Sequence, residues 1–387
     1  MLALALVGLL AAVPPGALQV APQGVERDRC TGEPPVTSSV GATSSRPEVG
    51  QLCRGARGSS PVTQSAASRG TREAKSSGRD GIDQAFDSAA DASVGSYALA
   101  DRRADEKSRP SNLRRGELLT PEGVVIDRAE FADHAERADF ILIGESHASR
   151  CDHLMQASLI AGLAHRGLSP TVGLEAIPVD QRAVIDLFNQ GRIEPQDLGK
   201  ALAWPTIWGF DYGLYEPVFQ VARRFELPVA ALNVPKNVVR MVLDGKVKPA
   251  EVKPRWLLPR VVILAPPAQE PELRRVFEEH RAFGHGKQRG RRDRGTLEEE
   301  FERFVLAQSL WDSKMALEAI DAHKKHGSPV VILAGVGHVE HGWGVPHRLQ
   351  VLAPEARVLT VLPWRGGEQP EAGAADLFFY CPMDQDD

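Results

Sequence analysis

The amino-acid sequence predicts an α/β fold with a mostly parallel sheet flanked by helices. Four short apolar runs, at residues 140–143, 171–174, 229–232 and 330–333, are typical of strands buried on both faces. Helical stretches separate these runs, and this alternation is typical of a doubly wound sheet. A proline precedes each of the last three runs, where it stops a helix and is tolerated at the first residue of a strand.

Local patterns place the remaining elements along the chain. The longest predicted helix begins at a capping box formed by Thr296 and Glu299 and continues to about Lys324. Residues 116–123 are expected to form an entry loop, and the prolines around residues 260–265 favour packed coil over a strand. Further helices are expected over 131–137, 150–165, 179–189, 195–202, 215–225, 235–244 and 345–352, and further strands over 124–127, 357–362 and 377–380.

Residues 1–116 are expected to be disordered, so that one α/β domain spans residues 117–387. This region lacks apolar periodicity and is rich in Ser, Arg, Gly, Ala and Pro, so it cannot bury enough apolar surface to offset its chain entropy. Residues 1–13 are apolar and fit a signal-peptide core, but they lack a basic flank and are too short for a transmembrane helix. Export and a mis-assigned start codon both remain open, and no lipobox precedes Cys30 or Cys53.

Charge and cysteine content exclude several classes of protein. The net charge of -5 and the pI of about 6.2 do not indicate a nucleic-acid-binding protein. One basic run, at residues 287–294, is interpreted as a solvated loop, with an anion-docking patch as the alternative. The four cysteines, Cys30, Cys53, Cys151 and Cys381, show no zinc spacing and do not predict a disulfide framework, and Cys151 is expected to be a small buried side chain rather than a nucleophile.

Ionisable and polar side chains follow each of the four apolar runs. They are Glu145 with His147, Glu175, Asn233 and His338. Because the carboxyl ends of parallel strands meet at one edge of an open α/β sheet, we expect these side chains to lie together. Two carboxylates, two imidazoles and an amide at one edge suit a metal, a haem or acid–base catalysis. The alternative interpretation is a helix-capping cluster whose polar groups satisfy one another.

Other residues near this edge are weaker candidates. His153 lies on the helix after Glu145 and could face back toward the edge, while Arg240 could pair with Glu175 or with an anionic ligand. Tyr212 and Tyr215 fall in or beside an aromatic stretch, where packing is the simpler role. The sequence contains no GxSxG, HExxH or CxxC motif, which excludes the common serine-hydrolase, zincin and zinc-finger classes.

Five motifs in this order resemble the ChaN-like haem-binding family of the haem-uptake and Tiki superfamily. They are Gly144–His147 with His153, Gly173–Glu175 with Gln181, Trp204 and Trp208–Gly209 with Tyr215–Pro217, Leu227–Asn233 with Arg240, and Gly335–His338 with Gly344–Pro346 and Arg348–Leu349. The resemblance covers roughly residues 120 to 380 and implies an α/β core with a helical lid. It also implies a homodimer with stacked haems and a role in iron uptake.

The resemblance implies two alternative sites. In a haem-binding protein, a tyrosine takes the iron, for which Tyr212 and Tyr215 are the candidates, with His147, His153 and Arg240 around the cofactor. In a Tiki-type protease or erythromycin-esterase-like hydrolase, Glu145, His147, Glu175 and His338 would hold manganese or cobalt and carry out hydrolysis. A scaffold without a ligand is the third hypothesis. We expect haem or another small molecule as the ligand.

Overall fold

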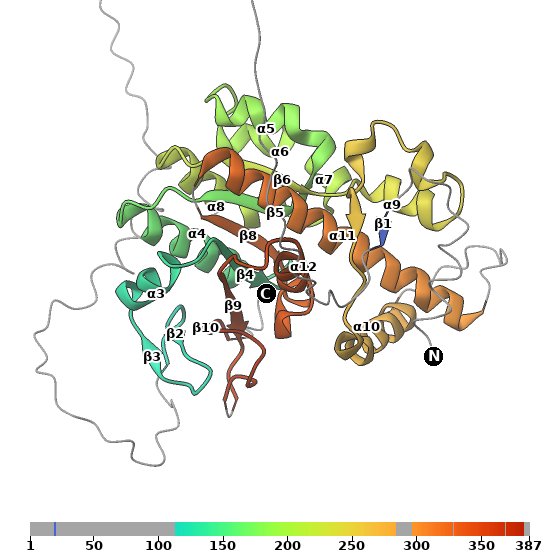
Figure 1. Ribbon diagram of the computed structural model, residues 1–387. Helices are drawn as coiled ribbons and strands as arrows, with labels where there is room; N and C mark the ends of the chain where they lie inside the picture. Colours follow the sequence, from blue (N-terminus) through green and yellow to red (C-terminus); the bar gives the residue numbers. More distant parts are fainter. Residues whose placement is uncertain (1–18, 21–112, 284–295, 328, 368, 383–387) are drawn as a thin grey trace, which may run out of the picture. The chain divides into compact units, whose positions relative to one another are not determined.

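The computed structural model describes residues 19–20, 113–283, 296–327, 329–367 and 369–382 (Figure 1). The predicted disorder of residues 1–116 and the predicted basic loop at 287–294 fall outside them, apart from residues 19–20 and 113–116.

The described residues contain an eight-stranded, mostly parallel sheet, which confirms the predicted fold class. Its order is β3-β2-β10-β9-β4-β8-β5-β6, and neighbouring strands from β10 to β6 run parallel, while β2 and β3 are antiparallel additions at one edge. The strands are β2 (Leu118–Leu119), β3 (Val125–Ile126), β4 (Phe140–Glu145), β5 (Thr171–Pro178), β6 (Val229–Asn233), β8 (Val330–Gly335), β9 (Val358–Trp364) and β10 (Leu377–Tyr380).

Helices flank this sheet and bury both of its faces. Phe140 and Leu142 of β4 pack in one core cluster with Met315 and Ile320 of α11 and with Leu349 of α12. The α-helices are α3 (Arg128–Ala135), α4 (Arg150–His165), α5 (Arg182–Asn189), α6 (Pro195–Ala201), α7 (Trp204–Ile207), α8 (Tyr212–Arg224), α9 (Lys236–Leu243), α10 (Glu270–Phe283), α11 (Leu297–His326) and α12 (Val345–Leu352). Short 3-10 helices are η1 (Val179–Gln181), η2 (Pro249–Glu251), η3 (Arg255–Leu257), η4 (Pro267–Gln269), η5 (Val336–His338) and η6 (Glu340–Gly342). Figure 1 shows α11, in orange, crossing in front of the central strands.

The register of the central strands brings the predicted site together. Strand β4 lies between β8 and β9, and Glu145 pairs with Gly335 at the carboxyl end of β8. Strand β5 lies on the other side of β8, and its pairing with β6 shifts between Leu174 and Pro178. Glu175 falls in this irregular stretch, where a bulge re-aims side chains. The ends of β4, β8 and β5 therefore meet at one edge.

Most predicted helices and strands are confirmed, and two predictions of local structure are wrong. The predicted entry loop contains β2, which pairs with β10. The predicted packed coil at 260–265 contains a two-residue strand, β7 (Val261–Val262), which pairs in parallel with β1 (Gln19–Val20). Prolines around such a short strand do not disturb it because few ladder hydrogen bonds are needed. In the described part of the chain, no helix combines the length and apolar character needed to cross a membrane.

The structure also corrects the interpretation of the cysteines. Cys151 and Cys381 form a disulfide between residues 230 apart in sequence. The sequence does not reveal this pairing, because only the fold brings the end of β10 beside the start of α4. Cys151 is buried as predicted, but it is bonded rather than free.

Candidate functional site

Glu145, the last residue of β4, is the centre of a buried hydrogen-bond network. Its Oε1 accepts from the Tyr215 hydroxyl at 2.5 Å and lies 2.9 Å from Nδ1 of His147. Its Oε2 accepts from Nε2 of Gln156 at 2.8 Å and lies 3.4 Å from Nδ1 of His153. Only 3% of Glu145 is exposed, so this carboxylate is fully engaged by its neighbours.

These contacts keep Glu145 ionised and orient His147. Burial would raise the pKa of Glu145, but His147, His153 and the Tyr215 hydroxyl together lower it below its ordinary value. For His147, burial lowers the pKa, and the carboxylates of Glu145 and Glu175 outweigh this effect and raise it. The Nδ1 atom of His147 therefore carries the proton that it donates to Glu145, and Nε2 is the atom left for a ligand.

A second histidine–carboxylate pair lies at the end of β8. Nδ1 of His338 lies 2.6 Å from Oδ1 of Asp312, a buried residue of α11. Nε2 of His338 lies 3.4 Å from Oε1 of Glu175. Arg348, which is fully buried on α12, lies 3.3 Å from the other oxygen of Asp312 and holds it in place. His338 is therefore fixed between two carboxylates.

Electrostatics make this second pair strongly ionised. Burial would raise the pKa of Glu175, but His338, His147 and the backbone N–H of Gly335, at 2.7 Å, lower it to about 2. Burial lowers the pKa of His338, and Glu175 and Asp312 raise it well above its ordinary value. At neutral pH, a carboxylate faces an imidazolium here, which is a site able to exchange a proton for a cation.

Gly335 allows the two pairs to approach each other. A Cβ atom at this position would lie 2.8 Å from Cε1 and 3.0 Å from Nε2 of His147, and 3.7 Å from Oε2 of Glu175. Nε2 of His147 and the Glu175 carboxylate thus border the same point above Gly335. Each histidine has a carboxylate on Nδ1, and Nε2 of His338 lies 3.4 Å from Glu175, an arrangement that orients histidines for a metal ion.

The helical lid is the segment from α5 to α8, and its aromatic residues border His147. The His147 ring contacts Trp208 edge-on at 4.8 Å between centroids and Phe210 at 5.1 Å. Lys236 of α9 donates to the Trp208 carbonyl at 2.9 Å and lies 4.6 Å from the centre of its ring. Phe210 is 38% exposed. His147 therefore lies beneath an aromatic wall with a cation beside it.

Both candidate tyrosines are engaged in hydrogen bonds. Tyr215 is 1% exposed, donates to Glu145 and accepts from Nε1 of Trp208 at 2.8 Å, and burial is the main cause that raises its pKa. The Tyr212 hydroxyl donates to the Pro195 carbonyl at 2.5 Å, and burial also raises its pKa. A tyrosine that ligates iron does so as a free phenolate, so a tyrosine ligand stays a prediction that requires these hydrogen bonds to break.

The remaining predicted residues have different positions. His153 is fully buried, and its Nε2 lies 3.2 Å from the His147 carbonyl, so it holds the backbone of His147 in place. Asn233 donates to the Glu175 carbonyl at 3.2 Å and fixes the end of β5. Arg240 is exposed on α9, where its charge acts on Asp244, whereas Lys236, one turn earlier, interacts with Glu175.

Sequence reasoning missed Asp312 and the structural role of Arg348. The signal for Asp312 is visible in the sequence, because it interrupts the apolar face formed by Leu310, Trp311 and Met315. A charge on an apolar helix face is costly unless it is paired. Which strand end it reaches depends on helix packing, which the sequence does not reveal.

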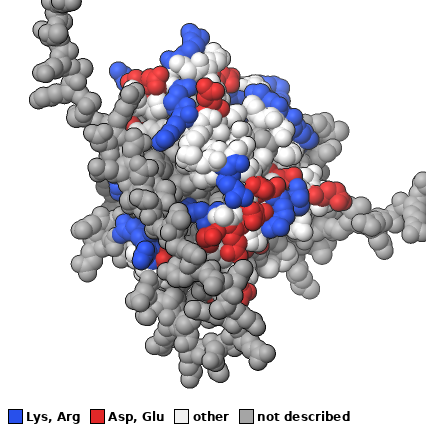
Figure 2. All heavy atoms as spheres, turned by 90° about the vertical axis from the view of Figure 1, so that its left-hand side faces the viewer, with Lys and Arg blue, Asp and Glu red and all other residues white. Residues whose placement is uncertain are grey.

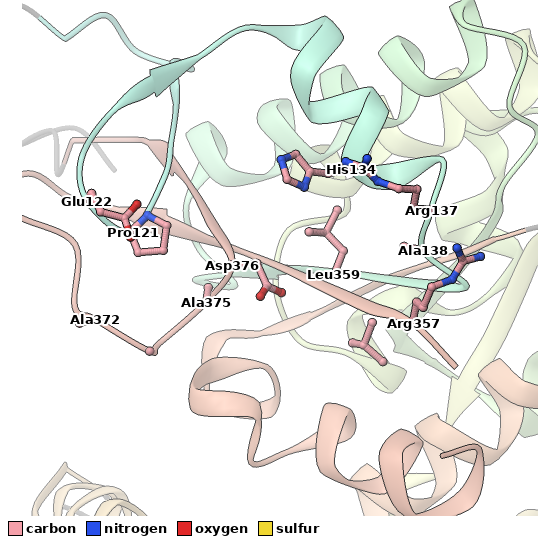
Figure 3. Close-up of a pocket in the computed structure, with 12 residues that line it drawn as sticks. Pro121, Glu122, His134, Arg137, Ala138, Arg357, Leu359, Ala372, Ala375 and Asp376 are labelled. Carbon is pink, nitrogen blue, oxygen red and sulfur yellow. The ribbon is translucent and has the colours of Figure 1, made fainter. Parts of the chain in front are cut away.

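A separate pocket of about 630 Å³ lies at the amino ends of β9 and β10 (Figure 3). Figure 3 shows Arg137 and Arg357 on one side and Pro121 and Glu122 on the other. Its lining contains none of the site residues described above. Oδ2 of Asp376 in this pocket accepts two hydrogen bonds from Thr360, so this oxygen is already occupied.

Fold and site together define an α/β protein with two histidine–carboxylate pairs at the carboxyl edge of its sheet. The family described as haem-binding uptake, Tiki superfamily, ChaN matches residues 131–349, more than half of the chain. The chain belongs to this family. The recognised resemblance is thereby confirmed, and the matched region contains every site residue named above.

A solved structure with a TM-score above 0.5 shares the fold. ChaN of Campylobacter jejuni, solved with cofacial haem binding, has a TM-score of 0.52 at 18% identity and covers 68% of this chain and 95% of its own. An erythromycin esterase, EreC, in its open conformation has a TM-score of 0.37 at 13% identity and covers 64% of this chain and 76% of its own. None of the curated proteins matches the chain.

Proposed function

We propose that this protein binds haem at the carboxyl edge of the sheet, with His147 as the axial ligand of the iron. The observation that carries this proposal is the state of the His147 ring. Its Nδ1 is held by Glu145, its side chain is 28% exposed, and Trp208 and Phe210 lie against it. A histidine oriented through Nδ1 is a prepared ligand for iron.

The surrounding residues fit haem as well. Haem is a flat apolar ring with two anionic propionates, and it supplies an iron ion whose reactivity the axial ligand tunes. Phe210 offers exposed aromatic surface, and the ammonium group of Lys236 lies beside Trp208. Tyr212 and Tyr215 are the alternative ligands, with His153 and Arg240 in supporting positions. A role in haem or iron uptake, and a homodimer that shares the haem-binding face, are part of the proposal.

A haemin titration followed in the Soret band tests this proposal. We expect saturable binding in the wild-type protein, loss of the Soret shift in His147→Ala, and little change in Tyr212→Phe or Tyr215→Phe. His134→Ala, a change of an exposed histidine on α3, is the matched control. Size-exclusion chromatography with haemin tests the dimer. Loss of binding in one tyrosine variant alone would move the iron ligand to that tyrosine. Unsaturable binding that ignores all variants would exclude a specific haem site.

A metal-dependent hydrolase is the second candidate, favoured by the two histidine–carboxylate pairs that converge on Glu175. His147, Glu175 and His338 would hold a divalent cation such as manganese or cobalt. Glu145 and Asp312 would then orient the histidines through Nδ1 rather than bind the metal. Among the described residues, a group of three or more His, Cys, Asp or Glu side chains with ligand atoms all within 4.8 Å of one another occurs only at Cys151, Asp152 and Cys381, whose cysteines are joined.

Because of this spacing, a cation would have to draw the three ligands together. We expect Mn²⁺ or Co²⁺ binding, measured by calorimetry on chelator-treated protein, to disappear in His338→Ala. His341→Ala, which changes a histidine of η6 outside the two pairs, is the control. Metal binding with equal affinity in wild type and His338→Ala would exclude this metal site. Haemin binding by a protein that binds no metal would support haem binding and reject the hydrolase.

A further inference from the structure

A second polar cluster lies behind the loop that carries His147. We call residues 146–149, between β4 and α4, the His147 loop. Arg365, directly after β9, donates to both oxygens of Asp152 at 2.7 and 2.6 Å. The same guanidinium donates to Oγ of Ser146 at 2.8 Å. Asp152, in the first turn of α4, is fully buried, and its Oδ2 also accepts the backbone N–H of Ser146 at 2.8 Å.

The disulfide lies next to this cluster. Cys151 precedes Asp152, and Nη1 of Arg365 donates to the carbonyl of Cys381 at 3.1 Å. The N–H of Cys381 in turn donates to the carbonyl of Trp364 at 2.9 Å. The start of α4, the end of β9 and the residue after β10 are thus joined by one covalent bond and a closed set of hydrogen bonds.

We propose that Arg365 is a positioning residue for the His147 loop and that the Cys151–Cys381 disulfide holds it in place. A guanidinium fork that meets a carboxylate through two hydrogen bonds fixes both position and angle. Without Arg365, Asp152 would be a buried and unpaired charge, which is strongly unfavourable. Asp152 would then take water or turn away, and the Ser146 N–H would lose its acceptor.

The position of Ser146 matters because the loop is held from two sides. Asp152 holds Ser146, and His153 holds the carbonyl of His147. The His147 ring can meet Glu145 only while this backbone stays in place. A loss of haem affinity when the His147 loop loses its order is expected only under the function proposed above. The ordering of the loop by Arg365 does not depend on that function.

Assembly of the site is thereby linked to thiol oxidation. The two thiols lose two electrons and two protons to a disulfide oxidant such as oxidised glutathione, which is reduced to two thiols as the Cys151–Cys381 bond forms. Both sulfur-bearing residues are buried in the folded protein, so the bond is set during folding and is shielded afterwards. The loop becomes fully ordered only in a protein that has been oxidised.

Amide hydrogen exchange of the full chain tests the proposal without any ligand. The measured quantity is the exchange rate of the Ser146 amide relative to the Ile141 and Leu142 amides of β4 in the same protein. An acceleration at Ser146 that exceeds the acceleration at Ile141 and Leu142 reports local opening of the loop, because global unfolding exposes all three amides equally. We expect the ratio to rise roughly 10- to 100-fold in Arg365→Met, since a charge-assisted hydrogen bond is lost. Arg365→Lys, which keeps the charge but not the fork, should give a smaller rise.

Two further proteins complete the experiment. In Cys151→Ser/Cys381→Ser the ratio should also rise, but less than in Arg365→Met. Arg357→Met, which changes an exposed arginine at the other end of β9 paired with Asp139 at 3.6 Å, is the matched control and should leave the ratio unchanged. A wild-type ratio in Arg365→Met, or equal acceleration in Arg357→Met, would overturn the proposal. Haemin titration of the same proteins is read separately: absence of binding in wild type rejects the haem function and leaves the exchange result intact.

Discussion

At the scale of single residues, the position of His147 depends on the absence of a side chain at residue 335. The glycine lets the imidazole lie against the end of β8, between Glu145 and Glu175. A methyl group in this position would contact the ring at 2.8 Å. Because Glu145 holds the ring from the other side, His147 has little room to move away from such a methyl group.

We therefore expect Gly335→Ala to displace His147. Its effect on stability should be about 1–3 kcal/mol, the usual cost of overpacking, and haemin affinity should fall with it. Gly337→Ala is the matched control, because no atom lies within 4 Å of its added methyl group. Thermal unfolding and haemin titration of both variants measure the two effects. Equal haemin affinity in Gly335→Ala and Gly337→Ala would show that His147 does not need its present position.

The ionised Glu175 carboxylate gives a pH-dependent contribution to stability. Its pKa is lowered from 4.5 to about 2, so its contribution is present above pH 4.5 and is lost as the pH falls toward 2. We expect the difference in unfolding free energy between wild type and Glu175→Gln to shrink by on the order of 2–3 kcal/mol over this range. Glu355→Gln, a change of an exposed glutamate, is the control. Denaturant unfolding at several pH values measures both differences, and a constant difference for Glu175→Gln would contradict the ionic network.

The contribution of His338 to stability changes with pH in the opposite direction. Its raised pKa means that its contribution is present below pH 6.5 and is lost as the pH rises through the folded-state value.

The candidate residues Glu145, His147, Glu175 and His338 could be located from the sequence because each follows an apolar run. Asp312 and Arg365 could not be located in this way, since their partners come from helices and strand ends distant in sequence.

At the scale of elements, the strength of the local signal decided what could be predicted. Helix α11 has a capping box at Thr296 and Glu299 and ends at Gly327 in a left-handed conformation, so its start and its extent were predictable. Strands β2 and β7 have two residues each and carry no periodicity. They exist because β10 and residues 19–20 supply hydrogen-bond partners, which is information about the whole fold.

The capping box of α11 should contribute measurably to stability. The Thr296 hydroxyl accepts the N–H of Glu299 at 3.2 Å, and the Glu299 carboxylate accepts the N–H of Thr296 at 2.8 Å. Thr296→Ala should lower the unfolding free energy by about 1 kcal/mol. Thr296→Ser keeps the hydroxyl and should stay within a few tenths of wild type. Chemical denaturation measures both, and equal losses in the two variants would rule out the cap as the cause.

At the scale of the whole molecule, the site is assembled from residues between 145 and 348 by the order of the strands. Strand β8 lies between β4 and β5, and this single fact of topology joins the two histidine–carboxylate pairs. On the face shown in Figure 2, positive and negative side chains are interspersed rather than separated. Inside the site, three buried carboxylates, Glu145, Glu175 and Asp312, face two histidines whose pKa they raise.

The disulfide acts at this largest scale because it closes a loop of 230 residues. Its loss should cost up to about 5 kcal/mol through the entropy of the unfolded chain. We expect Cys151→Ser/Cys381→Ser to unfold at a lower denaturant concentration than wild type, and Cys30→Ser/Cys53→Ser to serve as the control. Equal midpoints for all three proteins would indicate that Cys151 and Cys381 are not bonded in solution.

The identity of the iron ligand decides whether His147 or a tyrosine holds bound haem. Resonance Raman spectra of the ferric haem complex distinguish an imidazole ligand from a tyrosinate ligand. We expect no tyrosinate bands, and we expect an iron–nitrogen band that shifts on isotope labelling of histidine and disappears in His147→Ala. Tyrosinate bands that disappear in Tyr212→Phe or Tyr215→Phe would contradict His147 as the ligand.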